Sequence, residues 1–170
     1  MAKITALIHT HNDAPRIGRA VESLRACDEV LVIDHGSTDD TVKAARAHGA
    51  TVKPGVPGVN PGVYAVDAQH DWILCLLPSE AVGEALEASL FEWKERQNKN
   101  PDADKKDKNA EGANAYSIQV REEDGHGGWK ELGPHARLVN RKNVNWPGHL
   151  PSDVVDGEVL AGHLLRFATP

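Results

Sequence analysis

The sequence has few cysteines and few aromatic side chains. Its two cysteines, Cys27 and Cys75, lie far apart among 170 residues, and neither belongs to a Cys-x-x-Cys spacing. This pattern argues against a disulfide framework and against a cysteine-based zinc site, so both are expected to be buried free thiols. Only eight residues are aromatic, four of them tryptophans, which are expected to anchor the packing of the core.

The sequence also lacks a long apolar run and an excess of basic residues. No stretch approaches the roughly 18 apolar residues of a membrane-spanning helix. Nineteen Lys and Arg residues stand against 25 Asp and Glu residues, a net charge of −6, with no basic stripe. Nucleic acid is therefore not expected as a partner. The length fits one compact domain over residues 1–170, and a cytoplasmic protein is expected.

The first fifty residues alternate between strand and helix patterns. Ile4 to His9 and Glu29 to Asp34 are apolar runs typical of strands covered on both faces. Between them, Asp13 is expected to cap a helix that runs to about Ala26. After the second run, the turn at 36–40 precedes a helix that stops at Gly49, and a short strand is expected over 50–53. This order predicts crossover units and a parallel sheet.

The middle of the chain predicts a loop, a strand and a helix. Residues 54–62 contain three prolines and three glycines, which indicates an irregular loop. Asp71 to Leu77 is expected to form a fourth buried strand. Ser79 is then expected to cap a helix that reaches Arg96. Its buried face would carry Val82, Leu86, Leu90 and Trp93.

The second half of the chain predicts an extension of a different kind. Apart from Pro101, residues 97–114 hold no aliphatic, aromatic or sulfur-containing side chain larger than alanine, and a mobile loop is expected there. Residues 116–121 and 136–140 alternate like strands on either side of a turn at 125–128. The predicted fold class is α/β, with a mostly parallel, Rossmann-like sheet flanked by helices and an antiparallel or mixed C-terminal extension.

Polar side chains follow the first two predicted strands. His9-Thr10-His11-Asn12 ends the first, and Asp34-His35-Gly36-Ser37 ends the second. Ligands of open parallel sheets bind beyond the carboxyl ends of the strands, so this edge is the predicted site. The first strand is not followed by Gly-x-Gly-x-x-Gly, and the sequence has no Gly-Lys-Ser/Thr, which argues against a dinucleotide fingerprint and a P-loop.

These residues resemble a known family. Ile4-Thr-Ala-Leu-Ile-His-Thr-His-Asn12 and Cys27-Asp-Glu-Val-Leu-Val-Ile-Asp-His-Gly-Ser-Thr-Asp-Asp-Thr-Val42 are similar to the N-terminal half of family-2 glycosyltransferases. The subgroup resembled most is the lipopolysaccharide-core glucosyltransferase type. The likeness continues through residues 44–50, the strand at 71–74, Arg137-Leu138 and Trp146-x-Gly148.

The resemblance implies a GT-A-like fold that binds a nucleotide-diphosphate sugar, with a UDP-linked donor as one candidate. It implies that Thr10, Asn12, Asp34 and His35 line the nucleotide pocket and that Asp34 accepts a hydrogen bond from the base. Arg137 would lie on the pyrophosphate or acceptor side. Guanidinium groups pair well with phosphate oxygens, which agrees with that role.

The sequence departs from the family where the chemistry would occur. Leu77-Pro78-Ser79 replaces the acidic Asp-x-Asp motif that holds Mg²⁺ or Mn²⁺ on the diphosphate. These side chains offer no carboxylate, so the metal implied by the resemblance lacks its usual ligands. Pro151-Ser152 replaces a His-Glu pair of the subgroup. The remaining catalytic candidates are Glu80, His149 and Asp153.

Two other functions remain open at this point. One is a nucleotide or nucleotide-sugar binding module that does not catalyse transfer, which the missing acidic motif favours. The other is a metal-dependent hydrolase in which His9, His11 and His35 hold Zn²⁺ beside Asp34. Each of these interpretations has a structural alternative. The histidines would be polar residues at the rim of the sheet, and Thr10, Asn12 and Asp34 would serve in turns and helix caps.

Overall fold

The computed structural model describes residues 2–99, 113–153 and 158–169. Its elements follow the order β1 (Ile4–Thr10), α1 (Ala14–Glu22), β2 (Glu29–Asp34), α2 (Thr41–Ala47), β3 (Thr51–Pro54), the 3-10 helix η1 (Pro61–Asp67), β4 (Trp72–Leu76), β5 (Glu80–Val82), α3 (Glu84–Lys99), β6 (Ala115–Glu123), β7 (Trp129–Asn140) and β8 (Val159–Arg166). The described residues contain no helix that is both long and apolar enough to cross a membrane.

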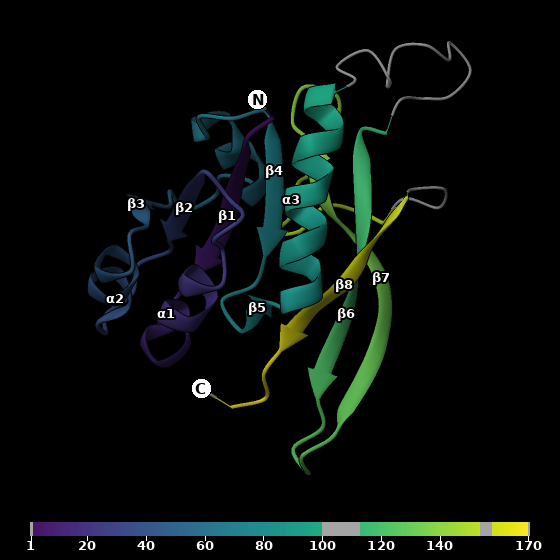
Figure 1. Ribbon diagram of the computed structural model, residues 1–170. Coiled ribbons are helices and arrows are strands. Elements are labelled where there is room, and N and C mark those ends of the chain that lie inside the picture. Colours follow the sequence, from purple (N-terminus) through teal and green to yellow (C-terminus); the bar gives the residue numbers. More distant parts are fainter. Residues whose placement is uncertain (1, 100–112, 154–157, 170) are drawn as a thin grey trace.

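One mixed sheet contains all eight strands, in the order β3-β2-β1-β4-β7-β6-β8-β5. The first four are parallel to one another, as the alternating pattern predicts. β7 then pairs antiparallel with β4 and β6, and β8 pairs parallel with β6 and antiparallel with β5. The α/β class and the mixed C-terminal extension are confirmed. Figure 1 shows β6, β7 and β8 curling away from the parallel strands, with α3 across the sheet.

The two faces of the sheet carry two apolar layers. Ile4, Ala6 and Ile8 of β1 face the layer that α1 and α3 complete. Leu7 faces the other side, where Tyr64 of η1 and Trp146 pack against the strands. Because successive strand residues point to opposite faces, the alternation of β1 divides its side chains between these layers. His9 therefore lies on the η1 side, next to Tyr64.

Several element boundaries differ from the sequence expectation. α1 ends at Glu22 rather than near residue 26. The carboxylate of Asp13 makes no cap bond to α1, because it accepts from the hydroxyl of Thr10 and the amide of His11 instead. In the segment expected to be irregular, η1 begins at Pro61.

The helix expected from Ser79 begins instead at Glu84. Residues 80–82 form β5, which pairs with a strand, β8, that the sequence pattern did not predict. Leu86, Leu90 and Trp93 are buried on one face of α3 as predicted, whereas Val82 belongs to β5. Residues 97–99 of the predicted loop form the last turn of α3, and 100–112 lie outside the described residues.

Candidate functional site

The carboxyl ends of β1, β2 and β4 meet at one edge of the sheet. In the strand register Thr10 lies beside Asp34, and Ile8 lies beside Leu76. A pocket of about 400 Å³ opens there, and its lining comes from the residues that follow these strands together with the loop after β7. The lining residues are His9, Thr10, His11, Asp13, Arg16, His35, Leu77, Pro78, Ser79 and His149.

A larger pocket of about 740 Å³ lies between η1 and residues 141–147. Its lining includes Val63 and Val66, whose side chains are exposed. We place the candidate site at the smaller pocket, because that pocket lies at the carboxyl ends of the parallel strands and is lined by Thr10 and His35, two of the residues predicted for binding.

Asp34 is held by the turn that follows β2. One oxygen of its carboxylate accepts the amide of Ser37 at 3.1 Å, and the other accepts the hydroxyl of Ser37 at 2.5 Å. A carboxylate has about four acceptor positions, so two remain for a ligand. The turn chemistry and the predicted role as an acceptor for a base are thus compatible.

Asn12 and Thr10 fix the loop after β1. Asn12 has a left-handed backbone, with φ of 52°, and its side-chain oxygen accepts the amide of Thr38 at 2.8 Å. The hydroxyl of Thr10 donates to Asp13 at 2.7 Å. The structure therefore brings Thr10, Asn12, Asp34 and His35 together. Thr10 and His35 line the pocket, while Asn12 and Asp34 hold the loops beside it.

Three histidines converge in the pocket, but they are not the three that the sequence suggested. Nδ1 of His9 lies 2.8 Å from Nε2 of His35, and the His149 ring stacks on both, with centroid separations of 4.8 and 5.7 Å. The ring of His11 turns away to the carbonyl oxygen of His35, at 2.8 Å from Nδ1. The predicted cluster of His9, His11 and His35 is corrected to His9, His35 and His149.

The histidine rings lie in an environment that disfavours positive charge. Burial, followed by the neighbouring His149 and His35, lowers the pKa of His9 to about 3. Burial and His149 also lower the pKa of His35. Both rings are therefore neutral at pH 7, and each has one nitrogen with a lone pair. In the 2.8 Å contact, the lone pair of one ring accepts the N–H of the other.

The segment that replaces the acidic motif lines the same pocket. Leu77, Pro78 and Ser79 face it and supply no carboxylate. The pocket's carboxylate belongs to Asp13, which is engaged by Thr10 and His11 and lies 3.6 Å from the guanidinium of Arg16. Mg²⁺ and Mn²⁺ prefer several oxygen ligands, so the residues present here do not fit such an ion.

Arg16 is a pocket residue that the sequence reasoning missed. It lies in the first turn of α1, and its buried Nε is ion-paired with Asp13 at 3.6 Å but makes no hydrogen bond among the described residues. Its position directly after the polar end of β1 is the signal that would have indicated it. The arginine places a positive charge in the lining of the pocket.

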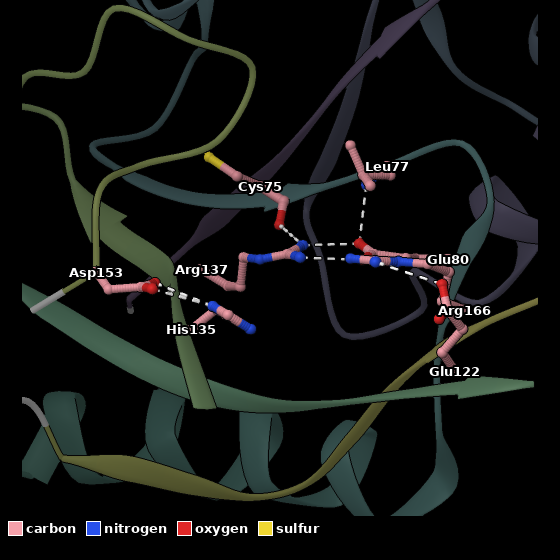
Figure 2. Close-up of polar contacts among 8 residues, drawn as sticks. All are labelled: Cys75, Leu77, Glu80, Glu122, His135, Arg137, Asp153 and Arg166. Atoms are coloured by element: carbon pink, nitrogen blue, oxygen red, sulfur yellow. Dashed lines mark hydrogen bonds and ion pairs between the residues drawn. The ribbon is translucent and has the colours of Figure 1, made fainter. Parts of the chain in front are cut away.

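Arg137 and Glu80 do not line this pocket but pair with each other in the interior, and Figure 2 shows their contacts. Both residues are 1% exposed, and two hydrogen bonds of 2.7 and 2.9 Å join them. Glu80 also accepts from the amide of Leu77 and from Arg166. The carboxylate is thus fully engaged in holding strands together, and the guanidinium faces Glu80 rather than the pocket of the histidines.

The other catalytic candidates are separated as well. His149 lies in the histidine cluster, whereas Asp153 contacts Nδ1 of His135 at 3.1 Å. Asp153 lines a different pocket of about 260 Å³, together with Pro151, Ser152 and Arg137. His149 and Asp153 thus do not form a pair, and within the described part of the chain neither makes a hydrogen bond or ion pair with Glu80.

Comparison with known proteins gives a partial sequence match. Residues 5–56 match the model of glycosyl transferase family 2. An uncharacterized glycosyltransferase of Rickettsia felis is 42% identical over 94 residues, which cover 53% of this chain and 33% of that protein. A glycosyltransferase relative in Rickettsia prowazekii is 38% identical over 94 residues, which cover 53% of this chain and 32% of that protein. The chain spans about a third of the length of these curated relatives.

Solved structures share the fold. A mycobacterial protein has a TM-score of 0.57 at 17% identity and covers 98% of this chain and 65% of its own. Glucosyl-3-phosphoglycerate synthase of Mycobacterium tuberculosis, solved with Mn²⁺ and UDP-glucose, has a TM-score of 0.56 at 18% identity. The match covers 87% of this chain and 61% of the synthase. TarS of Staphylococcus aureus has a TM-score of 0.53 at 17% identity, and the match covers 74% of this chain and 38% of the TarS chain. The fold is therefore GT-A-like, and the sequence matches support a relationship to family-2 glycosyltransferases.

Proposed function

We propose that this chain binds a nucleotide-diphosphate sugar at the carboxyl ends of β1, β2 and β4, in a cytoplasmic glycosyltransferase of the lipopolysaccharide-core glucosyltransferase type. One observation carries the proposal. The family resemblance assigns four residues to the nucleotide, and all four lie at the ends of two adjacent parallel strands. They are Thr10, Asn12, Asp34 and His35. They lie beside a pocket that also contains an arginine.

In this proposal each residue has a distinct part in holding the donor. The free acceptor positions of Asp34 take the imide N–H of a uracil base, while Ser37 keeps the carboxylate in place. Arg16 pairs with the diphosphate and gives it a hydrogen bond from Nε, which has only a 3.6 Å ion pair with Asp13 at present. A contact between Arg137 and the diphosphate, as the resemblance implies, requires that its pair with Glu80 first open.

Binding without sugar transfer is the second candidate, and a specific observation favours it. The pocket wall at Leu77, Pro78 and Ser79 has no carboxylate to hold a metal on the diphosphate, and the three catalytic candidates lie in three different places. A chain of this kind recognises the donor but lacks the groups that stabilise the leaving diphosphate. Turnover of a nucleotide sugar, or its absence in a protein that binds one, separates the two candidates.

The first experiment is a thermal-shift panel of UDP, GDP, TDP and CDP, each with and without Mn²⁺. A ligand at 100 times its dissociation constant adds about 2.7 kcal/mol of stability. We expect a shift with one base that does not depend on Mn²⁺. Asp34→Asn should reduce that shift, because the amide cannot accept at both of its atoms. Asp67→Asn, on the exposed end of η1, is the matched control.

Two outcomes would contradict the proposal. The first is the absence of a shift with any of the four nucleotides. The second is an equal shift in wild type and in a folded Asp34→Asn variant, which would show that the nucleotide does not bind at the end of β2.

A further inference from the structure

Three separate segments bring imidazole nitrogens to one point. His9 ends β1, His35 follows β2, and His149 lies in the loop after β7. One ring nitrogen from each residue lies within 4.8 Å of the other two. Because these residues are 26 to 140 positions apart in the chain, their convergence results from the tertiary fold.

The buried member of the cluster uses one ring nitrogen in its contact with His35. His9 is 4% exposed, and its Nδ1 is the nitrogen that lies 2.8 Å from Nε2 of His35. Its Nε2 makes no hydrogen bond of standard geometry among the described residues, and the backbone of Pro61 is a polar group beside the ring. The edge of the Tyr64 ring closes the site at 5.9 Å from His9 and 6.2 Å from His35, measured between ring centroids.

The position of His35 depends on a glycine. A Cβ added to Gly55 would lie 2.4 Å from Nδ1 of His35, so a larger residue there would displace the ring. The amide of Gly55 donates to the carbonyl oxygen of Asp34 at 2.8 Å, which fixes the backbone beside the ring. His35 is therefore held against His9 from two sides.

We propose that His9, His35 and His149 bind one zinc ion. Neutral imidazole nitrogens are among the commonest zinc ligands, and catalytic zinc sites often have three protein ligands and one open position. The cluster contains no carboxylate, which favours zinc over the oxygen-seeking Mg²⁺ and Mn²⁺. Zn–N distances of about 2.0–2.1 Å place the nitrogens of a tetrahedral site about 3.4 Å apart. Nδ1 of His9 and Nε2 of His35, which lie 2.8 Å apart, must therefore separate slightly, while a nitrogen of His149 moves toward them. His149 is exposed and can supply this movement by rotating its ring out of the stack.

The test is a titration of the untagged, metal-free protein with Zn²⁺, without nucleotide. The outcome is therefore independent of the proposed nucleotide site. Isothermal titration calorimetry should give one ion per chain. Co²⁺ should then produce the intense visible absorption of tetrahedral nitrogen ligation, and Zn²⁺ should displace it.

Three alanine variants test the ligand set. His149→Ala removes an exposed ring and should weaken zinc binding at least tenfold without a change in the circular dichroism spectrum. His11→Ala removes a neighbouring ring that points to a backbone carbonyl, and zinc affinity should stay at the wild-type value. His35→Ala should weaken binding as His149→Ala does, and it serves as the second ligand variant because the fully buried His9 is more sensitive to substitution.

Three results would overturn the proposal. One is the absence of saturable binding by Zn²⁺ to the wild-type protein. Another is equal affinity in wild type and in folded His149→Ala. The third is a loss of affinity in His11→Ala that matches or exceeds the loss in His149→Ala, which would assign the ion to another set of ligands.

Discussion

The guanidinium of Arg137 holds the carboxylate of Glu80 through two parallel hydrogen bonds of 2.7 and 2.9 Å. The pair joins β7 to β5, and Arg166 of β8 adds a third contact at 3.0 Å (Figure 2). Nη1 of Arg137 also donates to the carbonyl oxygen of Cys75 in β4 at 3.2 Å. This buried ion pair therefore connects the parallel strands with the C-terminal part of the sheet.

Removing the charge of Glu80 should destabilise the fold strongly. Glu80→Gln leaves Arg137 buried beside a neutral amide, and loss of one partner of a buried ion pair costs about 3–5 kcal/mol. The free energy of unfolding in urea measures the effect. Glu131→Gln breaks the exposed pairs with Arg121 and His163 and is the control, with an expected cost of about 1 kcal/mol or less. Equal losses in the two variants would contradict the structural role of the buried pair.

The same carboxylate should make stability depend on acid pH. Burial by itself raises the pKa of Glu80, but the hydrogen bonds and charge of Arg137, the amide of Leu77 and Arg166 together lower it. Because the pKa of Glu80 is lower in the folded state, the carboxylate adds stability at pH values above its pKa in the unfolded chain, about 4.3. That stability is lost as the pH falls through the pKa of the folded state.

Urea unfolding of wild type and Glu80→Gln between pH 7 and pH 3 tests this dependence. The stability difference between the two proteins should shrink as the pH falls below about 4.3. Glu92→Gln, on the exposed face of α3, controls for the loss of one negative charge. A difference that stays constant over the whole range would show that Glu80 does not carry this dependence.

Gly62 should tolerate no side chain. A Cβ at this position would lie 1.7 Å from the carbonyl oxygen of Trp146, so Gly62→Ala must displace η1 or the loop that leads to His149. Overpacking of this kind costs about 1–3 kcal/mol. Urea unfolding gives the cost, and tryptophan fluorescence should report a changed environment of the buried Trp146.

Gly148→Ala is the matched control for this substitution. Its Cβ would meet the carbonyl oxygen of Leu150 at 3.7 Å, an ordinary contact. Its stability should stay close to that of wild type. If the two variants are equally stable, η1 and the loop at 146–149 are not packed as described.

Restoring carboxylates in the pocket wall should create metal-dependent nucleotide binding. Leu77 and Ser79 line the pocket at the place where the family resemblance puts the acidic motif. The double variant Leu77→Asp and Ser79→Asp supplies two oxygen ligands for Mn²⁺ beside the proposed diphosphate. Calorimetry with a nucleoside diphosphate should show higher affinity with Mn²⁺ than without it.

The double variant Leu77→Asn and Ser79→Asn is the control, because it has similar volume without charge. No Mn²⁺-dependent gain in a correctly folded aspartate variant would show that residues 77–79 do not occupy the place of the acidic motif.

The parallel half of the sheet could be predicted from the sequence. β2 occupies Glu29–Asp34 as expected, and β1 extends the expected run by one residue to Thr10. Continuous apolar runs bounded by polar turns specify buried parallel strands from local information alone. The grouping of Thr10, Asn12, Asp34 and His35 followed from the same rule, because adjacent parallel strands end at one edge.

The strands β5 and β8 could not be predicted in this way. β8 contains Gly162 with φ of 94°, and its pairing with β6 shifts register between Ile118 and Gln119. The regular alternation of inward and outward side chains along β8 is therefore interrupted. β5 spans three residues and buries Glu80, a residue type that is rarely buried without a partner. Its conformation depends on partners in β7 and β8 that are distant in the sequence.

The sequence by itself determined the α/β class, the parallel strands and the polar edge where they end, because these follow from patterns a few residues long. The tertiary structure alone decided which distant side chains meet there. It placed His149 rather than His11 with His9 and His35, brought Arg16 into the pocket, and buried Arg137 against Glu80. Such contacts depend on the closure of long loops and on the register of β7 and β8, and no local pattern encodes either.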